Sequence, residues 1–187
     1  MLSSRFLLIP FALQALLMAV DEFYFHWQRK LPRWERIGHP LDTLTVLLCL
    51  GFLLFVRPSP LSTAIYALLC IFSCLFVTKD EWVHKQECPA GEQWLHALLF
   101  ILHPLLFISA GLLWMALHSG LPNLFDLIRY EGFERRFFIS NLGLIFAFGL
   151  YQAIYWNLLW KKLPVTSSTM TSTTTWASGG TRRKMTR

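Results

Sequence analysis

Long apolar runs separated by short polar segments make up most of the chain. Residues 61–78 and 137–160 contain no charged side chain, and residues 93–117 contain two histidines as their ionisable groups. An α-helix needs roughly 20 apolar residues to cross a bilayer, with about 17–25 tolerated. These three runs meet that length, whereas two further runs, residues 6–20 and 43–56, are each about five residues too short.

The two shorter runs reach spanning length only with flanking polar residues. The first must extend past Asp21 and Glu22 to about residue 25, and the second must begin near residue 37 and include His39 and Asp42. One short loop joins the two runs, so these polar extensions should lie at the same membrane face. We therefore predict an all-α, polytopic membrane helix bundle of five transmembrane helices, at approximately residues 6–26, 38–56, 61–84, 92–117 and 137–160.

The segments outside these runs complete the predicted organisation. Apolar and charged residues mix in residues 121–136, a pattern that predicts an amphipathic segment lying on the membrane surface. A Ser/Thr-rich stretch and a basic end predict a disordered tail over residues 164–187, after a transmembrane bundle of residues 1–163. The first apolar run could also be a signal peptide, but it has no clear small-residue cleavage site before Asp21, so we expect a retained helix.

Composition and charge narrow the class of protein. Hydrophobic residues are 55% of the chain and charged residues are 15%, against roughly 25% charged in a typical soluble domain, and the mean hydropathy is +0.45. This excludes an ordinary cytosolic enzyme and a nucleic-acid-binding arm, so we expect no nucleic-acid partner. Twelve of the 17 Lys and Arg residues lie on the side of the C-terminal tail. The positive-inside rule then predicts a plasma (inner) membrane protein with its N-terminus outside and its C-terminus in the cytoplasm.

The four cysteines do not indicate a disulfide framework or a thiolate zinc site. Cys49, Cys70 and Cys74 lie in apolar runs, Cys88 lies in a polar loop, and the chain has no CxxC pair. We expect them to behave as small buried hydrophobic residues.

Carboxylates and histidines gather on the predicted cytoplasmic face. Eight of the eleven acids and four of the six histidines fall there, and four successive helices each carry an acid and a histidine three or four residues apart. That spacing places two side chains on one helical face, where neutral imidazoles and carboxylates can converge on a divalent cation. The predicted metal ligands are Glu22, His26, His39, Glu81, His84, Glu92 and His96.

Further residues have predicted supporting roles. Glu92, His96 and His103 fall within about 40° of one another on a helical wheel, and His103 lies roughly 10 Å deeper than His96. An ionisable side chain inside a span is a functional hypothesis by default. We expect Asp21, Asp80 and His103 to act in catalysis or proton transfer, and Asp42 to support the metal ligands.

The basic linker after the first span carries Arg29, Lys30, Arg33 and Arg36 among aromatic residues. This composition predicts contact with anionic lipid headgroups, so membrane lipids are the expected partners.

Three functions fit these patterns. The first is a metal-dependent hydrolase or oxidoreductase, with Zn, or Fe or Mn, acting on a lipid or another apolar substrate. The second is a transporter of protons or a divalent cation. The third is a non-catalytic structural membrane protein whose charges pair across helices. The almost wholly apolar halves of the spans on the other face favour a closed pocket over a conduit.

Overall fold

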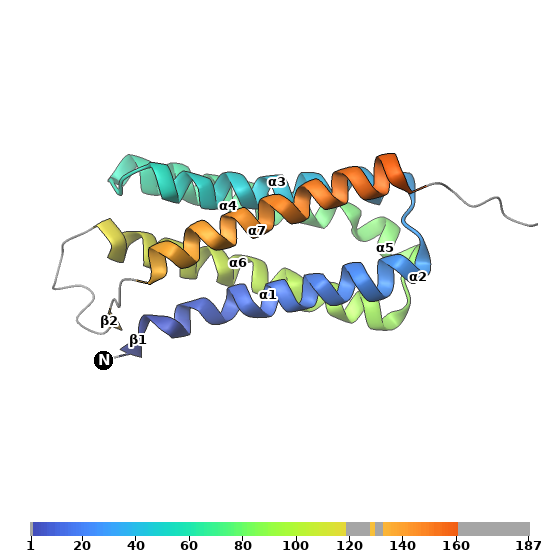
Figure 1. Cartoon of the computed structure of the whole chain (residues 1–187), viewed down its shortest axis with the longest axis horizontal. Coiled ribbons are helices and arrows are strands. Elements are labelled where there is room, and N and C mark those ends of the chain that lie inside the picture. Colours follow the sequence, from blue (N-terminus) through green and yellow to red (C-terminus); the bar gives the residue numbers. More distant parts are fainter. Residues whose placement is uncertain (1, 119–127, 130–132, 161–187) are drawn as a thin grey trace, which may run out of the picture.

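The chain folds into a bundle of five long helical columns that run side by side (Figure 1). The computed structural model describes residues 2–118, 128–129 and 133–160. The columns are η1 (Ser4–Leu8), α1 (Ile9–Val20), η2 (Asp21–His26) and α2 (Trp27–Arg29); then α3 (Arg33–Phe55); then α4 (Pro60–Phe76), η3 (Val77–Asp80) and α5 (Glu81–Glu87); then α6 (Ala90–His118); and last α7 (Glu134–Ile154) with η4 (Tyr155–Leu159).

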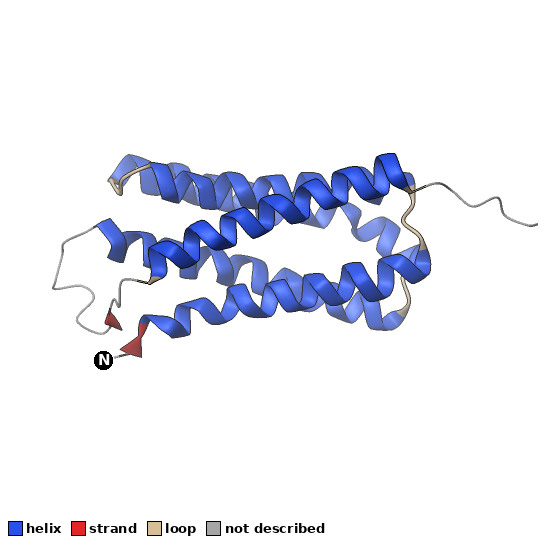
Figure 2. Ribbon diagram, in the orientation of Figure 1, coloured by secondary structure: helices blue, strands red, loops and turns tan. Residues whose placement is uncertain are grey.

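The described residues contain very little β-structure (Figure 2). The two-residue strands β1 (Leu2–Ser3) and β2 (Ile128–Arg129) pair in parallel and hold the start of the chain beside the segment that precedes α7. The predicted all-α class is thus confirmed. Most of the predicted surface segment 121–136, and the tail from residue 164, lie outside the described residues.

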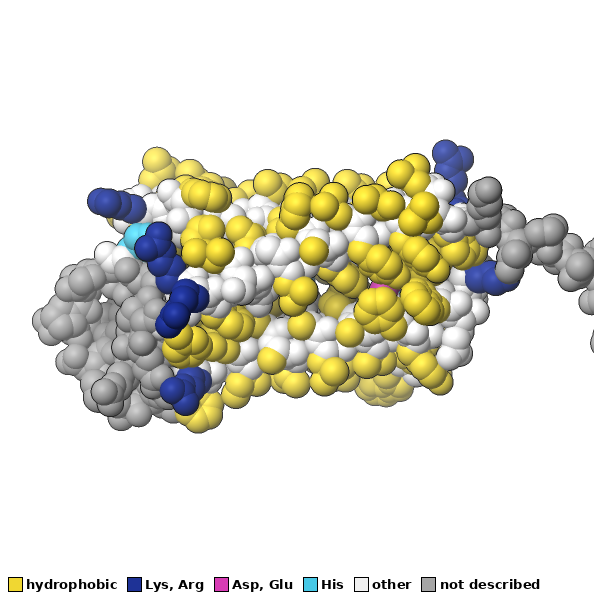
Figure 3. Space-filling model, viewed as in Figure 1, with side chains coloured by type: hydrophobic (Ala, Val, Ile, Leu, Met, Phe, Trp, Pro, Cys, Tyr) yellow, Lys and Arg dark blue, Asp and Glu magenta, His cyan; other side chains and the backbone are white. Residues whose placement is uncertain are grey.

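All five columns are long and apolar enough to cross a membrane. Much of the apolar surface points outward: Leu61, Leu68 and Leu75 of α4 are 72%, 66% and 67% exposed. Apolar side chains cover the middle of the visible face, and Lys and Arg side chains gather toward its two ends (Figure 3). A surface that is apolar around its middle is typical of a helix bundle surrounded by lipid.

The bundle holds an apolar core at the end where α1 begins. Here α1 packs against α6, α7 packs against α3, and α4 lies against both α3 and α6. Leu50, Leu53, Leu113 and Trp114 are almost fully buried in this core. The Trp114 indole donates a hydrogen bond of 2.8 Å to the carbonyl of Val56, which satisfies a polar group among apolar neighbours.

The second column begins earlier than the sequence pattern predicts. We expected a helix from about residue 38, whereas α3 starts at Arg33, directly after Pro32 as N-cap. The chain turns at Lys30, whose φ of 67° is a left-handed conformation, and then enters α3. The first turn of α3 therefore includes Glu35, which brings that carboxylate into the bundle instead of leaving it in a linker.

Two π-helical segments stand at the end opposite the core. η2 continues α1, and η4 continues α7. A π-turn takes one more residue than an α-turn, so residues five apart lie on the same side. On a regular α-helix Asp21 and His26 would be about 140° apart, whereas in η2 both face the bundle interior and are buried.

Candidate metal centre

Acidic and histidine side chains from four columns meet inside the bundle near η2. All are buried except His39, which is about one-eighth exposed at its side chain. We call them the acid–histidine cluster; its members are Asp21, Glu22, His26, Glu35, His39, His84, Glu92 and His96. The sequence pattern identified seven of these eight residues as site residues.

His26 is the most connected histidine of the cluster. Its Nδ1 lies 3.3 Å from Glu22 Oε2, within hydrogen-bond distance. Its Nε2 lies 3.2 Å from Asp21 Oδ2 and 3.8 Å from Glu92 Oε1, yet it makes no hydrogen bond to any residue that the structure describes. A carboxylate that holds one ring nitrogen and leaves the other facing acidic oxygens is the usual arrangement of a metal-binding histidine.

His96 and His84 form the opposite side of the cluster. His96 Nε2 lies 3.1 Å from Asp21 Oδ1, and its Nδ1 lies 3.1 Å from His84 Nδ1. The two carboxylate oxygens of Asp21 therefore each face a different imidazole. His84 Nε2 is buried, has no hydrogen-bond partner in the described part of the chain, and lies 3.9 Å from Glu35 Oε1. His39 stacks on His26 with ring centroids 4.7 Å apart, and its Nε2 is also unpartnered.

A single guanidinium bridges two acids of the cluster. Arg29 donates to both carboxylate oxygens of Glu35, at 3.2 and 2.6 Å, and to both oxygens of Glu92, at 2.7 to 3.2 Å. Its side chain is 12% exposed. We predicted that Arg29 would contact lipid headgroups, but the structure places it inside the bundle as a counter-charge for Glu35 and Glu92.

Glu22 is held by two side chains from the fifth column, one of which is in turn held by α3. The indole Nε1–H of Trp156 donates to Glu22 Oε1 at 2.5 Å, and the Gln152 amide lies 3.4 Å from Glu22 Oε2. The Thr43 hydroxyl in turn donates to Gln152 Oε1 at 2.8 Å. These bonds fix the carboxylate that orients His26.

The distances of the cluster suit a metal ion. One ligand atom from each of Asp21, His26, Glu92 and His96 can be chosen so that all four lie within 4.8 Å of one another. Two ligands on opposite sides of a metal ion are about 4.2 Å apart, at roughly 2.1 Å per bond. The set therefore needs only small side-chain movements to close on an ion. A mixture of imidazole and carboxylate ligands suits Zn, Fe or Mn.

Two other groups of ligands overlap this set. His26, Glu35 and His39 form one, and His84, Cys88 and His96 form the other. A cysteine binds a metal ion as its thiolate, whereas burial raises the pKa of the Cys88 thiol and so favours the neutral form. The four-residue set with two carboxylates is therefore the better candidate.

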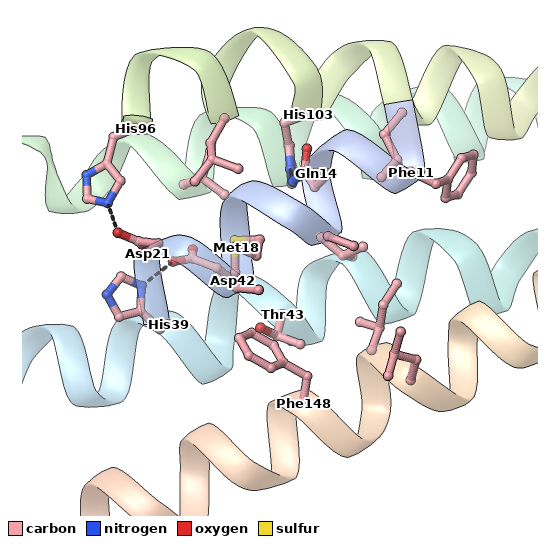
Figure 4. A pocket seen from close by; sticks show the side chains of 18 of the residues that line it. Phe11, Gln14, Met18, Asp21, His39, Asp42, Thr43, His96, His103 and Phe148 are labelled. Atoms are coloured by element: carbon pink, nitrogen blue, oxygen red, sulfur yellow. Dashed lines mark hydrogen bonds and ion pairs between the residues drawn. The ribbon is translucent and has the colours of Figure 1, made fainter. Parts of the chain in front are cut away.

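A cavity of about 500 Å³ runs from the cluster into the bundle. Figure 4 shows Asp21, His39, Asp42 and His96 together at one end, with Gln14 and His103 farther along and Phe11 beyond them. Its walls are mostly apolar, and its volume falls in the range of about 300–1,000 Å³ that is typical of ligand pockets. The cluster thus forms the polar end of an apolar cavity.

The predicted supporting residues occupy different places. His103 Nε2 lies 3.0 Å from Ser73 Oγ, and its Nδ1 lies 3.3 Å from the Gln14 amide, deeper than the cluster. Asp42 lines the cavity, accepts a hydrogen bond of 2.6 Å from Lys79 and lies 4.0 Å from His39 Nδ1. Asp21 is a member of the cluster.

Other predicted site residues lie at the margin. Glu81 Oε2 is 3.9 Å from His84 Nδ1, but the Glu81 side chain is 57% exposed. The side chain of Asp80 is outside the described part of the structure. Arg33 and Lys30 are exposed, and Arg36 lies over the Trp160 ring at 5.1 Å.

Several members of the site were missed by sequence reasoning. Glu35 lay in the predicted linker, so its signal was the helix start that Pro32 provides. Trp156 and Gln152 sit in a segment without charges, and only a polar stripe with Asn141 on the fifth span indicated that Gln152 faces inward. Comparison with protein-family models, curated proteins and solved structures finds no match to this chain.

Proposed function

We propose that this chain is a multi-pass membrane protein that holds a divalent metal ion in the acid–histidine cluster and uses it in chemistry on a lipid or another apolar substrate. The observation that carries the proposal is the charge balance of the cluster. Four carboxylates, those of Asp21, Glu22, Glu35 and Glu92, are at most 3% exposed. Arg29 is the permanent cation that contacts two of them, which leaves three formal negative charges to be offset.

Unpaired buried charges are too costly to remain, so protons or a bound cation must offset them. Protonated histidines could do so, but an imidazolium needs an acceptor for each ring N–H. Within the described residues, the Nε2 atoms of His26, His39 and His84 make no hydrogen bond, although Asp21 Oδ2 lies 3.2 Å from that of His26. Neutral imidazoles with free lone pairs and surplus carboxylates are instead the donors that a divalent metal requires.

The residues of the cluster divide into binding and supporting roles. Asp21, His26, Glu92 and His96 would hold the metal ion, with Glu22 orienting His26 and Arg29 limiting the negative charge. A bound ion of this kind supplies Lewis-acid activation of water, or redox chemistry if it is iron or manganese. His39 of the cluster and Asp42 beside it line the cavity, where they could move a proton to or from a substrate.

The shape of the cavity favours an enzyme over a transporter. A conduit for ions requires polar groups on both sides of the binding site. Beyond His103, the described helices instead close on the apolar core of Leu50, Leu53, Leu113 and Trp114. An apolar cavity that ends at a polar cluster suits an apolar molecule with one reactive polar group.

Metal analysis of the purified full-length chain tests the proposal. The wild-type protein in mild detergent should carry near-stoichiometric Zn, Fe or Mn by mass spectrometry, and the identity of the metal separates hydrolysis from oxidation–reduction. His96→Ala should lose most of it, whereas the matched control His118→Ala, at an exposed position, should not. Glu92→Gln and Glu81→Gln form a second pair, of which only the first should lose metal. Metal-free wild-type protein with unchanged stability would refute the proposal.

A further inference from the structure

The cavity wall between α1 and α7 has a distinctive construction. At the core end, Phe11 packs edge-to-face on Phe137 and Phe138, with ring centroids 5.4 and 5.9 Å apart. At the cluster end, the Trp27 indole donates to the Tyr151 hydroxyl at 3.1 Å, and Phe23 lies 5.9 Å from the Tyr151 ring. Aromatic contacts thus join the first and fifth columns at two levels.

From the core end toward the cluster end the two columns move steadily apart (Figure 1). The interval from Phe11 to Phe23 is about 18 Å of helix, at about 1.5 Å per residue. The α1 side chains that line the cavity in this interval include the small residues Ala15 and Ala19, and Leu144 lines it from α7. Ala15 and Leu144 are also exposed on the outer surface. The same residues therefore border both the cavity and the surroundings of the bundle.

The space-filling view shows the resulting opening. An acidic side chain is visible at its floor, on a face that is otherwise apolar over the middle of the bundle (Figure 3). Asp21 and Asp42 are acids of the cavity wall. The opening lies within the length of two columns that are apolar enough to span a membrane, so in a bilayer it would face hydrocarbon and not water.

We propose that one acyl chain of a membrane lipid enters the cavity sideways, through this opening between α1 and α7, with the polar linkage of the lipid beside the acid–histidine cluster. This inference rests on the proposed membrane location and names the substrate class of the proposed function. Apolar cavities take up apolar ligands, and a chain along the bundle axis would contact Phe11, Leu106 and Phe148. The amide oxygen of Gln14, which makes no hydrogen bond to a described residue, and the acid–histidine cluster are polar groups next to this path.

Photolabelling of the full-length protein in phosphatidylcholine vesicles tests the route. A small fraction of the phosphatidylcholine carries a diazirine in its acyl chain, and peptide mass spectrometry locates the adducts after irradiation. Leu106 is 3% exposed, so lipid outside the bundle cannot label it. We expect adducts at Leu106 or its cavity neighbours in the wild-type protein. Adducts confined to exposed positions such as Leu68 would overturn the inference.

Variants that fill the opening provide the specific controls. Ala15→Trp and Leu144→Trp, on opposite sides of the opening, should abolish interior labelling. Leu16→Trp and Phe146→Trp, at outward-facing positions that are 60% and 55% exposed, should preserve it. Equal interior labelling in Ala15→Trp and Leu16→Trp would refute the route.

Metal content is measured on the same samples. It should be unchanged in all four variants, which also shows that they have folded. Interior labelling without metal would contradict the proposed function and leave the lipid route standing, whereas metal without interior labelling would refute the route alone.

Discussion

The indole of Trp156 donates to the carboxylate of Glu22 across 134 residues of sequence, at 2.5 Å. Both residues lie in π-helical segments, Glu22 in η2 and Trp156 in η4. The bond therefore joins the π-helical segment of the first column to that of the fifth column. It also holds the carboxylate next to His26 Nδ1, so a residue distant in sequence helps to position a candidate metal ligand.

Trp156→Phe should lower the free energy of unfolding by about 1.5–3 kcal/mol, the usual size of a lost hydrogen bond to a charged group. The change removes the N–H and leaves a buried carboxylate oxygen without its donor. Denaturant titration in detergent measures the effect. Trp94→Phe, at a 75% exposed position, is the matched control and should change stability little. Equal stability of the two variants would contradict a role for this bond.

Removal of the bridging guanidinium should have a larger effect. Arg29→Met leaves Glu35 and Glu92 buried without their common partner, which costs about 3–5 kcal/mol when one side of a buried ion pair is lost. The thermal midpoint in detergent should fall sharply, and Glu35→Gln in the same chain should restore part of it. Arg33→Met, at an exposed position, should have little effect. If Arg33→Met lowered the thermal midpoint equally, the effect of Arg29→Met would reflect the connection between α2 and α3 and not the ion pairs.

The hydrogen bonds around His103 should matter for stability and not for metal content. Ser73 is fully buried and lies within hydrogen-bond distance of His103 Nε2, at 3.0 Å, and of Thr45 Oγ1, at 2.7 Å. Ser73→Ala leaves both groups short of a partner, so unfolding should become about 1–3 kcal/mol easier. Metal bound per chain should stay at the wild-type level. Ser140→Ala on the exposed side of α7 serves as the control; loss of metal in Ser73→Ala would place His103 in the metal site.

Two glycines of α7 should respond to alanine with opposite signs. A Cβ at Gly149 would lie 3.0 Å from Thr43 Cγ2, which would displace the side chain that bonds Gln152. Gly149→Ala should therefore destabilise the protein by about 1–3 kcal/mol, as overpacking does. At Gly143 a Cβ would meet nothing within 4 Å, so Gly143→Ala should stabilise the helix by about 0.5–1 kcal/mol. Thermal melts of both variants measure the difference; stabilisation by both would mean that Thr43 adapts without cost.

The sequence supports prediction of the columns and of many residues of the cluster. Apolar run length identifies three columns directly, and the other two follow once their flanking polar residues are included to reach the minimum length of a spanning helix. The sequence predicts that Glu92, His96 and His103 share one helical face. All three are buried in the structure, because α6 is helical over its whole length. Where a helix is regular, spacing predicts which residues meet.

The remaining details depend on departures from regular winding. Asp21 joins the cluster through the π-turn of η2, which no side-chain pattern in the sequence identifies. Glu81 follows the 3₁₀ turn η3, where three residues per turn change the phase of the column, and its side chain is 57% exposed. Arg29 and Glu35 meet because the chain reverses at Lys30. These contacts require the folded backbone.

The π-turn at Asp21–His26 makes the length of this segment as important as its side chains. Deletion of one residue there would restore ordinary winding and rotate the preceding part of the column by about 100°. Side chains of α1 that now face outward would then turn toward the cavity, while Phe11 and Gln14 would turn away from it. We therefore expect deletion of one residue between Asp21 and His26 to disrupt the candidate site even when Asp21, Glu22 and His26 are themselves kept.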